Sequence, residues 1–339
     1  MPQGDPATPS GPDSQDEPAI ALSIVVPCFN EADNLENLHR ELTKVCDPLV
    51  GSYEIVLVND GSRDRTWLEM QALAQRDRRV VAVDLSRNFG HQLALSAGLS
   101  ICRGARILTI DADLQDPPEL LADMMRLIDA GADVVYGRRV SRDGETAFKK
   151  LSARIFYRVL SKLSDVSIPL DTGDFRLMRR EVLDVLLDMP EQHRFIRGMV
   201  AWAGYSQVGL DYARRPRSAG ITGYNLVQMV RFAADAITGF SISPLRISLF
   251  CSLFFFAMSA VVLAYIIFSW LFLNVVAGWT STAVLISLFS AVQLLCLGII
   301  GEYVGRIFLE TKQRPLFVIR EISVQGLARK AKRITKPGS

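Results

Sequence analysis

Cysteine and histidine are scarce in this sequence, with five of the former and three of the latter among 339 residues. The cysteines, at positions 28, 46, 102, 251 and 296, show neither the paired spacing of a metal site nor a disulfide framework. We therefore expect reduced thiols. The spacing of His39, His91 and His193 does not suggest a histidine metal site either, and we expect these side chains to be structural or to face solvent.

Charged residues are absent between Arg246 and Glu302. Within this run, residues 247–272 and 280–301 are each longer than the roughly 20 residues that cross a bilayer core. We interpret them as a two-helix transmembrane hairpin joined by a tight turn; the alternative is one very long buried helix. Lys and Arg flank the run on both sides and are missing from the turn, so the positive-inside rule leaves both ends of the chain in the cytoplasm.

The two ends of the chain have biased compositions. Residues 1–19 are rich in Pro, Asp, Ser and Gly and lack the apolar core of a secretory signal, so we predict a disordered tail. The last residues, from Arg329 onward, form a basic tail suited to anionic lipid. We expect residues 20–222 to form a cytoplasmic domain, 223–246 a juxtamembrane helix and 302–339 a cytoplasmic C-terminal segment. The net charge of +2 is uninformative, and no nucleic-acid partner is expected.

Residues 146–163 combine an apolar stripe with basic residues at every fourth position, which are Lys150, Arg154, Arg158 and Lys162. A basic amphipathic helix of this type suits the surface of an anionic membrane. The alternative is a core-facing helix with a solvated basic side. The neighbouring apolar run favours the membrane interpretation.

Short runs rich in Val and Ile alternate with amphipathic segments from Leu22 onward. The predicted strands are residues 22–30, 54–60, 80–87, 106–113 and 133–139. The predicted helices are residues 35–45, 65–76, 91–101 and 119–130. This alternation predicts an α/β fold with a Rossmann-like, mostly parallel sheet covered on both faces. Ligands of such sheets bind beyond the carboxyl ends of the strands, at a topological switch point.

The stretch ILTIDADLQDPPE, residues 107–119, runs an apolar strand into Asp111, Asp113 and Asp116. Successive side chains of a strand point to opposite faces, so Asp111 and Asp113 are expected to project to the same side. Two carboxylates placed in this way can share one hard divalent cation, which suggests diphosphate chemistry. The alternative is a polar turn in which Asp is an ordinary loop former.

Six motifs follow one another along the chain: SIVVPCFNEADNL, VNDGSRDRT, SRNFGHQLALSAG, DADLQDPPE, TGDFRLM and GEYVGRIFLETKQRP. Together they resemble the polyprenyl-phosphate glycosyltransferases, inverting enzymes of glycosyltransferase family two related to dolichol-phosphate mannose synthase. The resemblance covers residues 23–315 and is closest to the bacterial branch with a two-helix membrane hairpin, which includes bactoprenol glucosyltransferases and the aminoarabinose transferase of lipid A modification.

The resemblance implies a GT-A nucleotide-sugar domain that uses Mg2+ or Mn2+. It implies a nucleotide-sugar site at Pro27, Asn30, Glu31, Asp60, Asn88 and Asp111. It implies a metal set of Asp111, Asp113 and Gln115, and catalytic roles for Asp113, Asp174 and Arg138. For Pro27 and Asp60 the alternative is a simple turn former at a strand end.

Arginines are the expected ligands of an acceptor phosphate, because guanidinium forks match phosphate oxygens. The candidates are Arg138, Arg139 and Arg217, and the alternative for each is a solvated surface charge. The family often shows a lysine in a pattern like AGESKY. The corresponding stretch here, Ala219–Tyr224, reads AGITGY and has no lysine, so that contact has no counterpart.

Asp174, in the TGDFRLM motif, is open to three roles: a base, a group that orients the acceptor, or a ligand of a sugar hydroxyl. A phosphate monoester has a second pKa of about 6, so it is largely a dianion at neutral pH and hardly needs a base. We therefore expect Asp174 to position a substrate.

The implied reaction transfers one sugar from a nucleotide sugar, UDP-glucose first, to a polyprenyl phosphate such as undecaprenyl phosphate. The implied location is the cytoplasmic face of a bacterial inner membrane, and a homo-oligomer is compatible with the sequence. A processive polysaccharide synthase is a weaker alternative, because two spans are too few for a polymer channel and the Q-x-x-R-W signature is missing. A catalytically inactive membrane scaffold with the same fold is the third interpretation.

Overall fold

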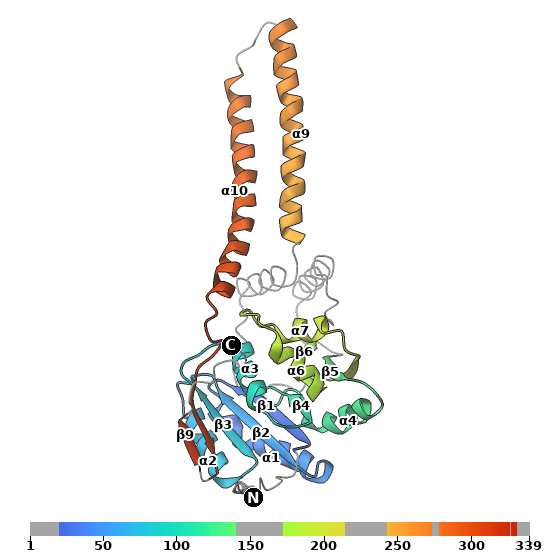
Figure 1. Cartoon of the computed structure of the whole chain (residues 1–339), viewed down its shortest axis with the longest axis vertical. Coiled ribbons are helices and arrows are strands. Elements are labelled where there is room, and N and C mark those ends of the chain that lie inside the picture. The colour runs from blue at the N-terminus through green and yellow to red at the C-terminus, as the bar shows by residue number, and fades with distance from the viewer. Residues whose placement is uncertain (1–19, 140–171, 214–242, 273–277, 326, 331–339) are drawn as a thin grey trace, which may run out of the picture.

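Two long helices project from an α/β domain in the computed structural model of the chain (Figure 1). The structure describes residues 20–139, 172–213, 243–272, 278–325 and 327–330. Three predicted segments therefore lie outside the described residues: the tail at 1–19, the basic helix at 146–163, and residues 223–242 of the juxtamembrane helix.

One sheet contains all the strands of the described part, in the order β7-β5-β6-β4-β1-β2-β3-β8-β9. Its centre is parallel and consists of β4 (Arg106–Thr109), β1 (Leu22–Cys28), β2 (Tyr53–Asn59) and β3 (Val80–Leu85). The chain passes from β1 outward to β2 and β3 and then returns to place β4 on the other side of β1. This reversal creates a topological switch point between β1 and β4.

Antiparallel and additional strands extend the sheet beyond β4. β6 (Thr172–Arg179) runs antiparallel between β4 and β5 (Val134–Arg139). β7 (Gln207–Tyr212) pairs parallel with the outer side of β5. The predicted strands are confirmed as β1 to β5, although β4 is shorter than predicted and ends at Thr109. The antiparallel insertion of β6 places the TGDFRLM motif directly beside the strand that leads to the acidic motif.

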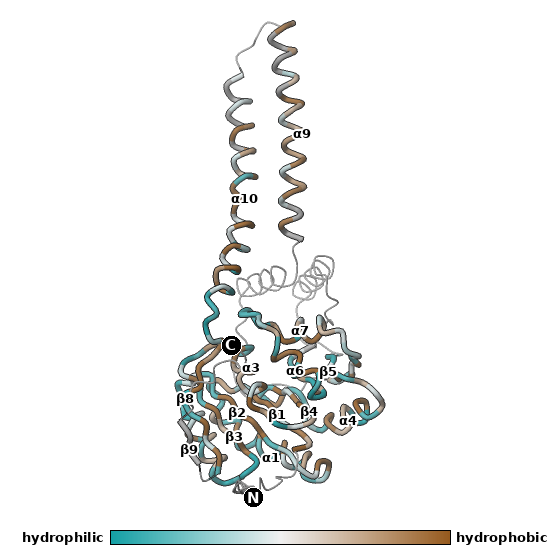
Figure 2. The backbone as a smooth tube through the Cα atoms, in the orientation of Figure 1, coloured by the Kyte–Doolittle hydropathy of each residue, from teal (hydrophilic) through white to brown (hydrophobic). Residues whose placement is uncertain are grey.

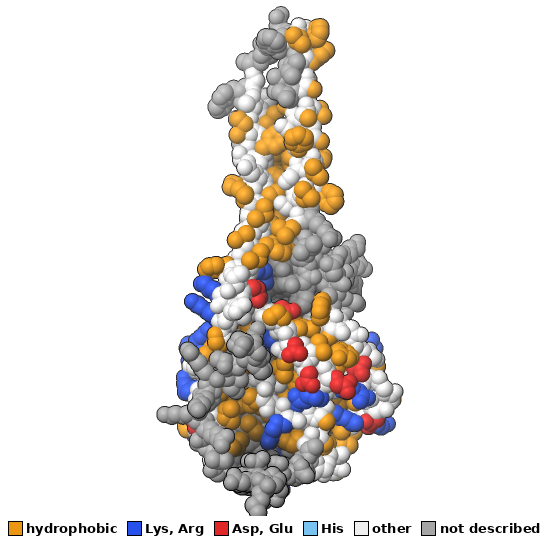
Figure 3. Space-filling view, in the orientation of Figure 1, with side chains coloured by type: hydrophobic (Ala, Val, Ile, Leu, Met, Phe, Trp, Pro, Cys, Tyr) orange, Lys and Arg blue, Asp and Glu red, His pale blue; other side chains and the backbone are white. Residues whose placement is uncertain are grey.

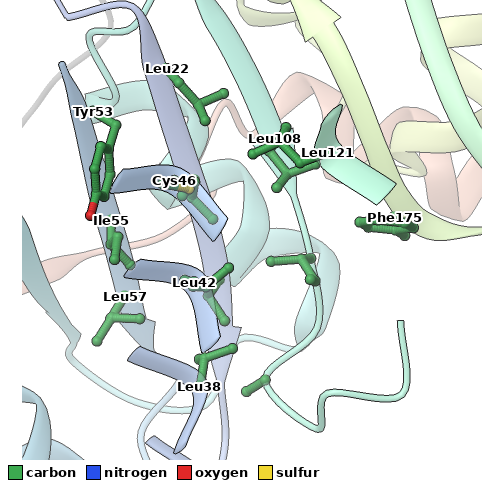
Figure 4. Packing of buried hydrophobic residues seen from close by; sticks show 14 of the residues in the cluster. Leu22, Leu38, Leu42, Cys46, Tyr53, Ile55, Leu57, Leu108, Leu121 and Phe175 are labelled. Atoms are coloured by element: carbon green, nitrogen blue, oxygen red, sulfur yellow. The ribbon is translucent and has the colours of Figure 1, made fainter. Parts of the chain in front are cut away.

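Helices cover both faces of the sheet, as the continuous apolar strands require. On one face lie α1 (Ala32–Leu49), α2 (Thr66–Arg76) and α4 (Leu121–Asp129), with the 3-10 turn Pro118–Leu120 before α4. On the other lie α3 (His91–Ile101), α6 (Arg180–Asp188) and α7 (Ile196–Trp202). Figure 4 shows the first layer, in which Leu38 and Leu42 of α1 pack over Ile55 and Leu57 of β2.

A glycine lets α3 lie directly on β1 and β2. A Cβ atom at Gly98 would come within 2.4 Å of Val25 Cγ1 and 2.9 Å of Val58 Cγ2. A larger residue would push the helix off the sheet. The close approach fixes the first residues of α3, His91 and Gln92, near the carboxyl ends of the central strands.

The two projecting helices are α9 (Ser243–Phe272) and α10 (Trp279–Thr311), and they pack antiparallel. The rings of Phe255 and Phe289 lie 5.7 Å apart, and Cys296 Sγ lies 3.8 Å from the carbonyl oxygen of Ser248. The alternative of one very long helix is therefore wrong.

The outer surface of these helices is apolar. Figure 2 shows hydrophobic residues along both helices, and Figure 3 shows charged side chains only at their base. Within the described residues, one segment, Leu288–Thr311, is long and apolar enough to cross a membrane, and α9 contributes the shorter apolar segment Ser248–Val262. That both helices cross a membrane stays a prediction.

The chain returns to the sheet after α10. β8 (Ile319–Val324) pairs antiparallel with β3, and β9 (Leu327–Lys330) pairs antiparallel with β8. Arg320 Nη1 donates to Asp84 Oδ2 at 3.0 Å, which fastens β8 to β3. The predicted C-terminal segment, 302–339, thus supplies an edge of the sheet, and the predicted basic tail begins inside β9.

Candidate active site

The loops that follow β1 and β2 hold each other in place. Asn30 adopts a left-handed backbone (φ 55°), its N–H donates to Ser62 Oγ at 3.0 Å, and its Oδ1 accepts from Arg63 N at 2.9 Å. Glu31 N donates to Thr66 Oγ1 at 2.9 Å. The predicted nucleotide residues Asn30 and Glu31 therefore belong to one interlocked pair of loops.

Pro27 lies inside β1, where it is buried and stands opposite Val58 of β2. It is therefore not the strand-end turn former that was the alternative. Backbone groups of a strand face its two neighbours alternately, and the carbonyl of Val25 accepts from Ile110 N on the β4 side. The backbone of Pro27 faces the same side, but β4 has already ended there. Proline has no N–H group, and at this position, where β1 and β4 separate at the switch point, no described strand needs that donor.

Asp60 is 3% exposed and holds the start of α3. Its two oxygens accept from Phe89 N at 2.7 Å and Gly90 N at 3.0 Å. Burial raises the pKa of Asp60, although the two amides act in the opposite direction. These contacts match the structural alternative. Asn88 is exposed in the loop that Asp60 holds. This loop passes close to Gly61, because a Cβ atom added at Gly61 would lie 2.5 Å from the backbone nitrogen of Asn88.

The acidic motif forms a loop, because β4 ends at Thr109. Asp111 and Asp113 therefore do not occupy alternate positions of a strand, and that part of the prediction is wrong. Leu114 has a left-handed backbone (φ 54°), which a branched side chain disfavours, and Asp113 Oδ1 accepts from Gln115 N at 3.2 Å across this bend. The loop is a bent structure that faces the carboxyl end of β1.

Asp111 Oδ1 is buried and accepts no hydrogen bond from the described residues. The imidazole of His91 approaches it, with Nε2 at 3.5 Å. Burial raises the pKa of Asp111 to about 6, with the charges of Asp174, Asp116 and Asp113 adding to the effect and His91 opposing it. A buried carboxylate oxygen without a donor is a ready ligand for a cation.

Asp174 has the opposite environment. It is 5% exposed; its Oδ1 accepts from Arg197 Nε at 2.9 Å, and its Oδ2 accepts from Gln92 Nε2 at 2.8 Å and contacts His91 Nε2 at 3.1 Å. Burial alone would raise the pKa of Asp174, but Arg197, His91 and Arg176 together hold it well below its ordinary value. The carboxylate is therefore a caged anion.

His91 bridges the two carboxylates, with Nε2 3.1 Å from Asp174 Oδ2 and 3.5 Å from Asp111 Oδ1. Burial would lower the pKa of His91, but the hydrogen bond to Asp174 and the charge of Asp111 raise it. The expectation of a structural or solvent-facing histidine missed this bridge. The available signal was its place at the start of a helix beside the predicted crevice.

The two arginines at the end of β5 face different surroundings. Arg139 Nη2 lies 3.6 Å from Asp116 Oδ1, and its Nε donates to Tyr212 Oη at 3.2 Å. Arg138 is exposed, and its Nη2 donates to Asp211 Oδ2 at 2.9 Å. The structure therefore brings Arg139, but not Arg138, to the acidic loop. Arg217 lies outside the described residues.

Two further arginines surround Asp174, and neither was predicted as a site residue, although Arg176 lies in the TGDFRLM motif. Arg197 comes from α7, and Arg176 lies two residues along β6, is 3% exposed and has Nη2 4.0 Å from Asp174 Oδ1. Burial lowers the pKa of Arg176 to about 10. Two guanidinium groups therefore lie near one carboxylate, and His91 adds a third positive charge when it is protonated.

The donor set fits a metal that is completed by substrate. In the described part of the chain, His, Cys, Asp and Glu side chains form no group of three or more that could hold a metal ion. The predicted set needs only two carboxylates and the amide of Gln115. Mg2+ commonly binds one or two carboxylates and takes its other oxygens from water and substrate phosphates. Asp111 Oδ1, which accepts no hydrogen bond from the described residues, agrees with such a site.

Comparison with known proteins identifies the family. Residues 23–187 match the model for glycosyl transferase family 2, and residues 243–307 match the GtrB C-terminal hairpin. An uncharacterized glycosyltransferase of Bacillus subtilis, YkcC, is 43% identical over 303 residues, which are 89% of this chain and 94% of that protein. The chain belongs to glycosyl transferase family 2. It is therefore a glycosyltransferase, and its domain has the GT-A-like fold.

Other relatives carry more specific names. The bactoprenol glucosyl transferase of Shigella phage SfV is 37% identical over 302 residues, 89% of this chain and 98% of that protein. Among solved structures, glucosyl-3-phosphoglycerate synthase from Mycobacterium tuberculosis with Mn2+, uridine-diphosphate and phosphoglyceric acid is similar at a TM-score of 0.44 and 18% identity, over 65% of this chain and 76% of that one.

Proposed function

We propose that this glycosyltransferase moves a single sugar, glucose, from UDP-glucose to a polyprenyl phosphate such as undecaprenyl phosphate. The observation that carries the proposal is Asp111 Oδ1, a buried acidic atom that receives no hydrogen bond from the described residues. It lies at the switch point of a sheet whose chain continues into an apolar helical hairpin. The relatives named bactoprenol glucosyl transferase, which this chain matches over 89% of its length, support the sugar and the acceptor.

Asp111, Asp113 and Gln115 would hold Mg2+ or Mn2+. When bound, the cation offsets negative charge on the departing diphosphate. The interlocked loops with Asn30 and Glu31 border the nucleoside, and the exposed Asn88 completes that side. Asp60 acts indirectly in this proposal, because its oxygens hold the loop that carries Asn88.

Asp174 acts as a positioning residue. The low pKa of Asp174 makes it a poor base near neutral pH. The phosphate of the lipid substrate has a second pKa of about 6 and therefore has little need of a base. The caged carboxylate instead fixes the orientation of Arg197 and His91. Arg197 and the buried Arg176 carry positive charge, and His91 adds to it when protonated, so this cluster favours the approach of an anionic substrate.

Arg139 is the described arginine best placed for the acceptor phosphate, since it lies beside Asp116 in the acidic loop. Arg217 remains a proposed second ligand. Arg138 is not included, because its guanidinium pairs with Asp211 on an exposed part of the sheet.

The hairpin would hold this site at the membrane surface. Large apolar side chains along α9 and α10 are exposed, as Phe250, Phe256 and Leu294 illustrate at 68%, 76% and 68%. An apolar surface of this extent needs a cover, and hydrocarbon supplies one. With both helices crossing, both termini and the domain would lie in the cytoplasm, at the inner membrane of a bacterium. The lipid acceptor then reaches the site by diffusion in two dimensions.

The test uses the full-length protein in membranes, undecaprenyl phosphate, and a panel of labelled UDP- and GDP-sugars. We expect one glucose per lipid from UDP-glucose by mass spectrometry, with loss of activity in chelator and recovery with Mg2+ or Mn2+. Undiminished transfer in chelator by the double variant Asp111→Ala, Asp113→Ala would contradict the proposal. A polymeric product would instead support a processive synthase.

A further inference from the structure

The last turn of α10 touches the domain through a carboxylate. Glu310 is half-buried there, and its Oε1 accepts from the backbone N–H of Gln192 at 2.8 Å. A negative side chain at the C-terminal end of a helix is disfavoured by the helix dipole. Glu310 therefore does not serve the stability of α10 itself, and its contact with the domain calls for another explanation.

Gln192 lies in the loop at residues 189–195, which connects α6 to α7. Arg194 Nη2 donates to the carbonyl of Met189 at 2.7 Å, and its Nη1 donates to the carbonyl of Leu186 at 3.3 Å, so one end of the loop is tied to α6. The bond to Glu310 ties its middle. The loop is therefore held between the domain and the projecting helix.

The far end of this loop leads directly to the Asp174 cage. Ile196 N, at the start of α7, donates to Gln92 Oε1 at 3.0 Å, while Gln92 Nε2 donates to Asp174 Oδ2 at 2.8 Å. The next residue, Arg197, donates to Asp174 Oδ1 at 2.9 Å. A shift of the loop would thus move two of the donors that fix Asp174.

The end of α10 is itself fixed to the sheet. Only residues 312–318 separate the helix from β8. The carbonyl of Val318 accepts from Ser86 N at 2.8 Å, and Arg320 pairs with Asp84 at 3.0 Å. The end of α10 that carries Glu310 is therefore anchored to the sheet, and the 189–195 loop binds to the Glu310 carboxylate.

We propose that Glu310 is a positioning residue that couples the hairpin to the active site. By holding Gln192, it sets the 189–195 loop, and through that loop the placement of Gln92 and Arg197 against Asp174. The inference rests on the proposed function, since it makes efficient sugar transfer depend on the position of α10 against the domain.

The kinetic test compares three variants of the full-length protein. Glu310→Ala removes the acceptor, and we expect kcat to fall about tenfold while KM for the nucleotide sugar changes less than about twofold, because misplaced groups slow the reaction more than they weaken donor binding. Glu310→Gln keeps an acceptor oxygen and should retain most of the activity. Glu302→Ala is the matched control, since Glu302 is exposed on the same helix and pairs with Arg306 at 3.1 Å.

A second measurement does not depend on turnover. Amide hydrogen exchange of the full-length protein should become faster across residues 189–199 in Glu310→Ala, and stay at the wild-type rate in Glu310→Gln and Glu302→Ala. If the wild type transfers no sugar to the lipid, the proposed function fails, yet the exchange result still tests the coupling.

Three outcomes would overturn the coupling: wild-type kcat and exchange in Glu310→Ala, equal losses in Glu310→Ala and Glu310→Gln, or the same loss in Glu302→Ala. Should Glu310→Ala not accumulate, Glu310→Met takes its place with the same reading, because methionine keeps the length of the side chain but offers no acceptor oxygen.

Discussion

The two sides of the switch point use the same kinds of polar residue in different ways. On the side of β2 and β3, the oxygens of Asn30 and Asp60 are occupied by backbone N–H groups of neighbouring loops. On the side of β4 and β6, Asp111 Oδ1 has no donor from the described residues, and Asp174 is bound by side chains. Residues of the first side hold the neighbouring loops in place, whereas Asp174 on the second side holds the side chains of Arg197 and Gln92.

Asp111→Asn should give the largest effect on activity, a fall of about 10²–10³-fold in kcat, the range seen when one electrostatic contact to the reacting group is removed. Stability in chelator should be retained or increased, because the substitution relieves a buried charge. Activity assays and thermal unfolding check the two halves of this prediction. Asp123→Asn, on the exposed part of α4, is the control and should change neither.

Asp174→Asn should lower kcat by about 10²-fold, since it loosens the cage around Arg197 and His91. The lost activity should not recover as the pH rises from 6 to 9, because a caged anion does not act as a base in this range. A rate that recovers as the pH rises, with unaltered affinity for both substrates, would contradict the positioning role.

The pH dependence of stability should differ between wild type and Asp111→Asn. In the folded protein the pKa of Asp111 is about 6, against 3.8 ordinarily, so the folded state binds more protons between pH 4 and pH 6. Metal-free wild type should therefore lose up to about 3 kcal/mol relative to the variant as the pH rises through that window. Asp60 shifts in the same direction and cancels in the difference. Asp174 shifts in the opposite direction, and its window lies below pH 4.

Asp60→Asn should have the smallest effect on activity, within about threefold, but should reduce the free energy of unfolding by about 1–3 kcal/mol. The new amide group faces one of the two N–H groups at Phe89 and Gly90, which is left without an acceptor. Thermal unfolding measures the change. A large rise in KM for the donor without loss of stability would instead indicate direct nucleotide contact by Asp60.

Local patterns predicted the elements that depend on local chemistry. The helix expected at residues 91–101 is α3 with the same bounds, because its apolar spacing is a sequence-local signal. The antiparallel β6 and the return of β8 to β3 depend on pairings across the whole domain, so no window of sequence reveals them.

The candidate site shows the same limit. Asp111 could be predicted because its motif is contiguous, whereas the His91 contact to Asp174 joins residues 83 positions apart. Arg138 and Arg139 were both candidates for the acceptor phosphate and Arg138 was the favoured one, yet the alternation of side chains along β5 sends Arg138 toward Asp211 and Arg139 toward Asp116.

The pairing of β8 with β3 has a consequence for folding during synthesis, because β8 follows both long helices in the chain. A ribosome delivers both hydrophobic helices before it delivers Ile319–Val324, so the outer edge of β3 stays unpaired until translation has passed α10. A bare strand border invites association with other chains. The nascent enzyme therefore completes the sheet of its α/β domain only after both apolar helices have been made.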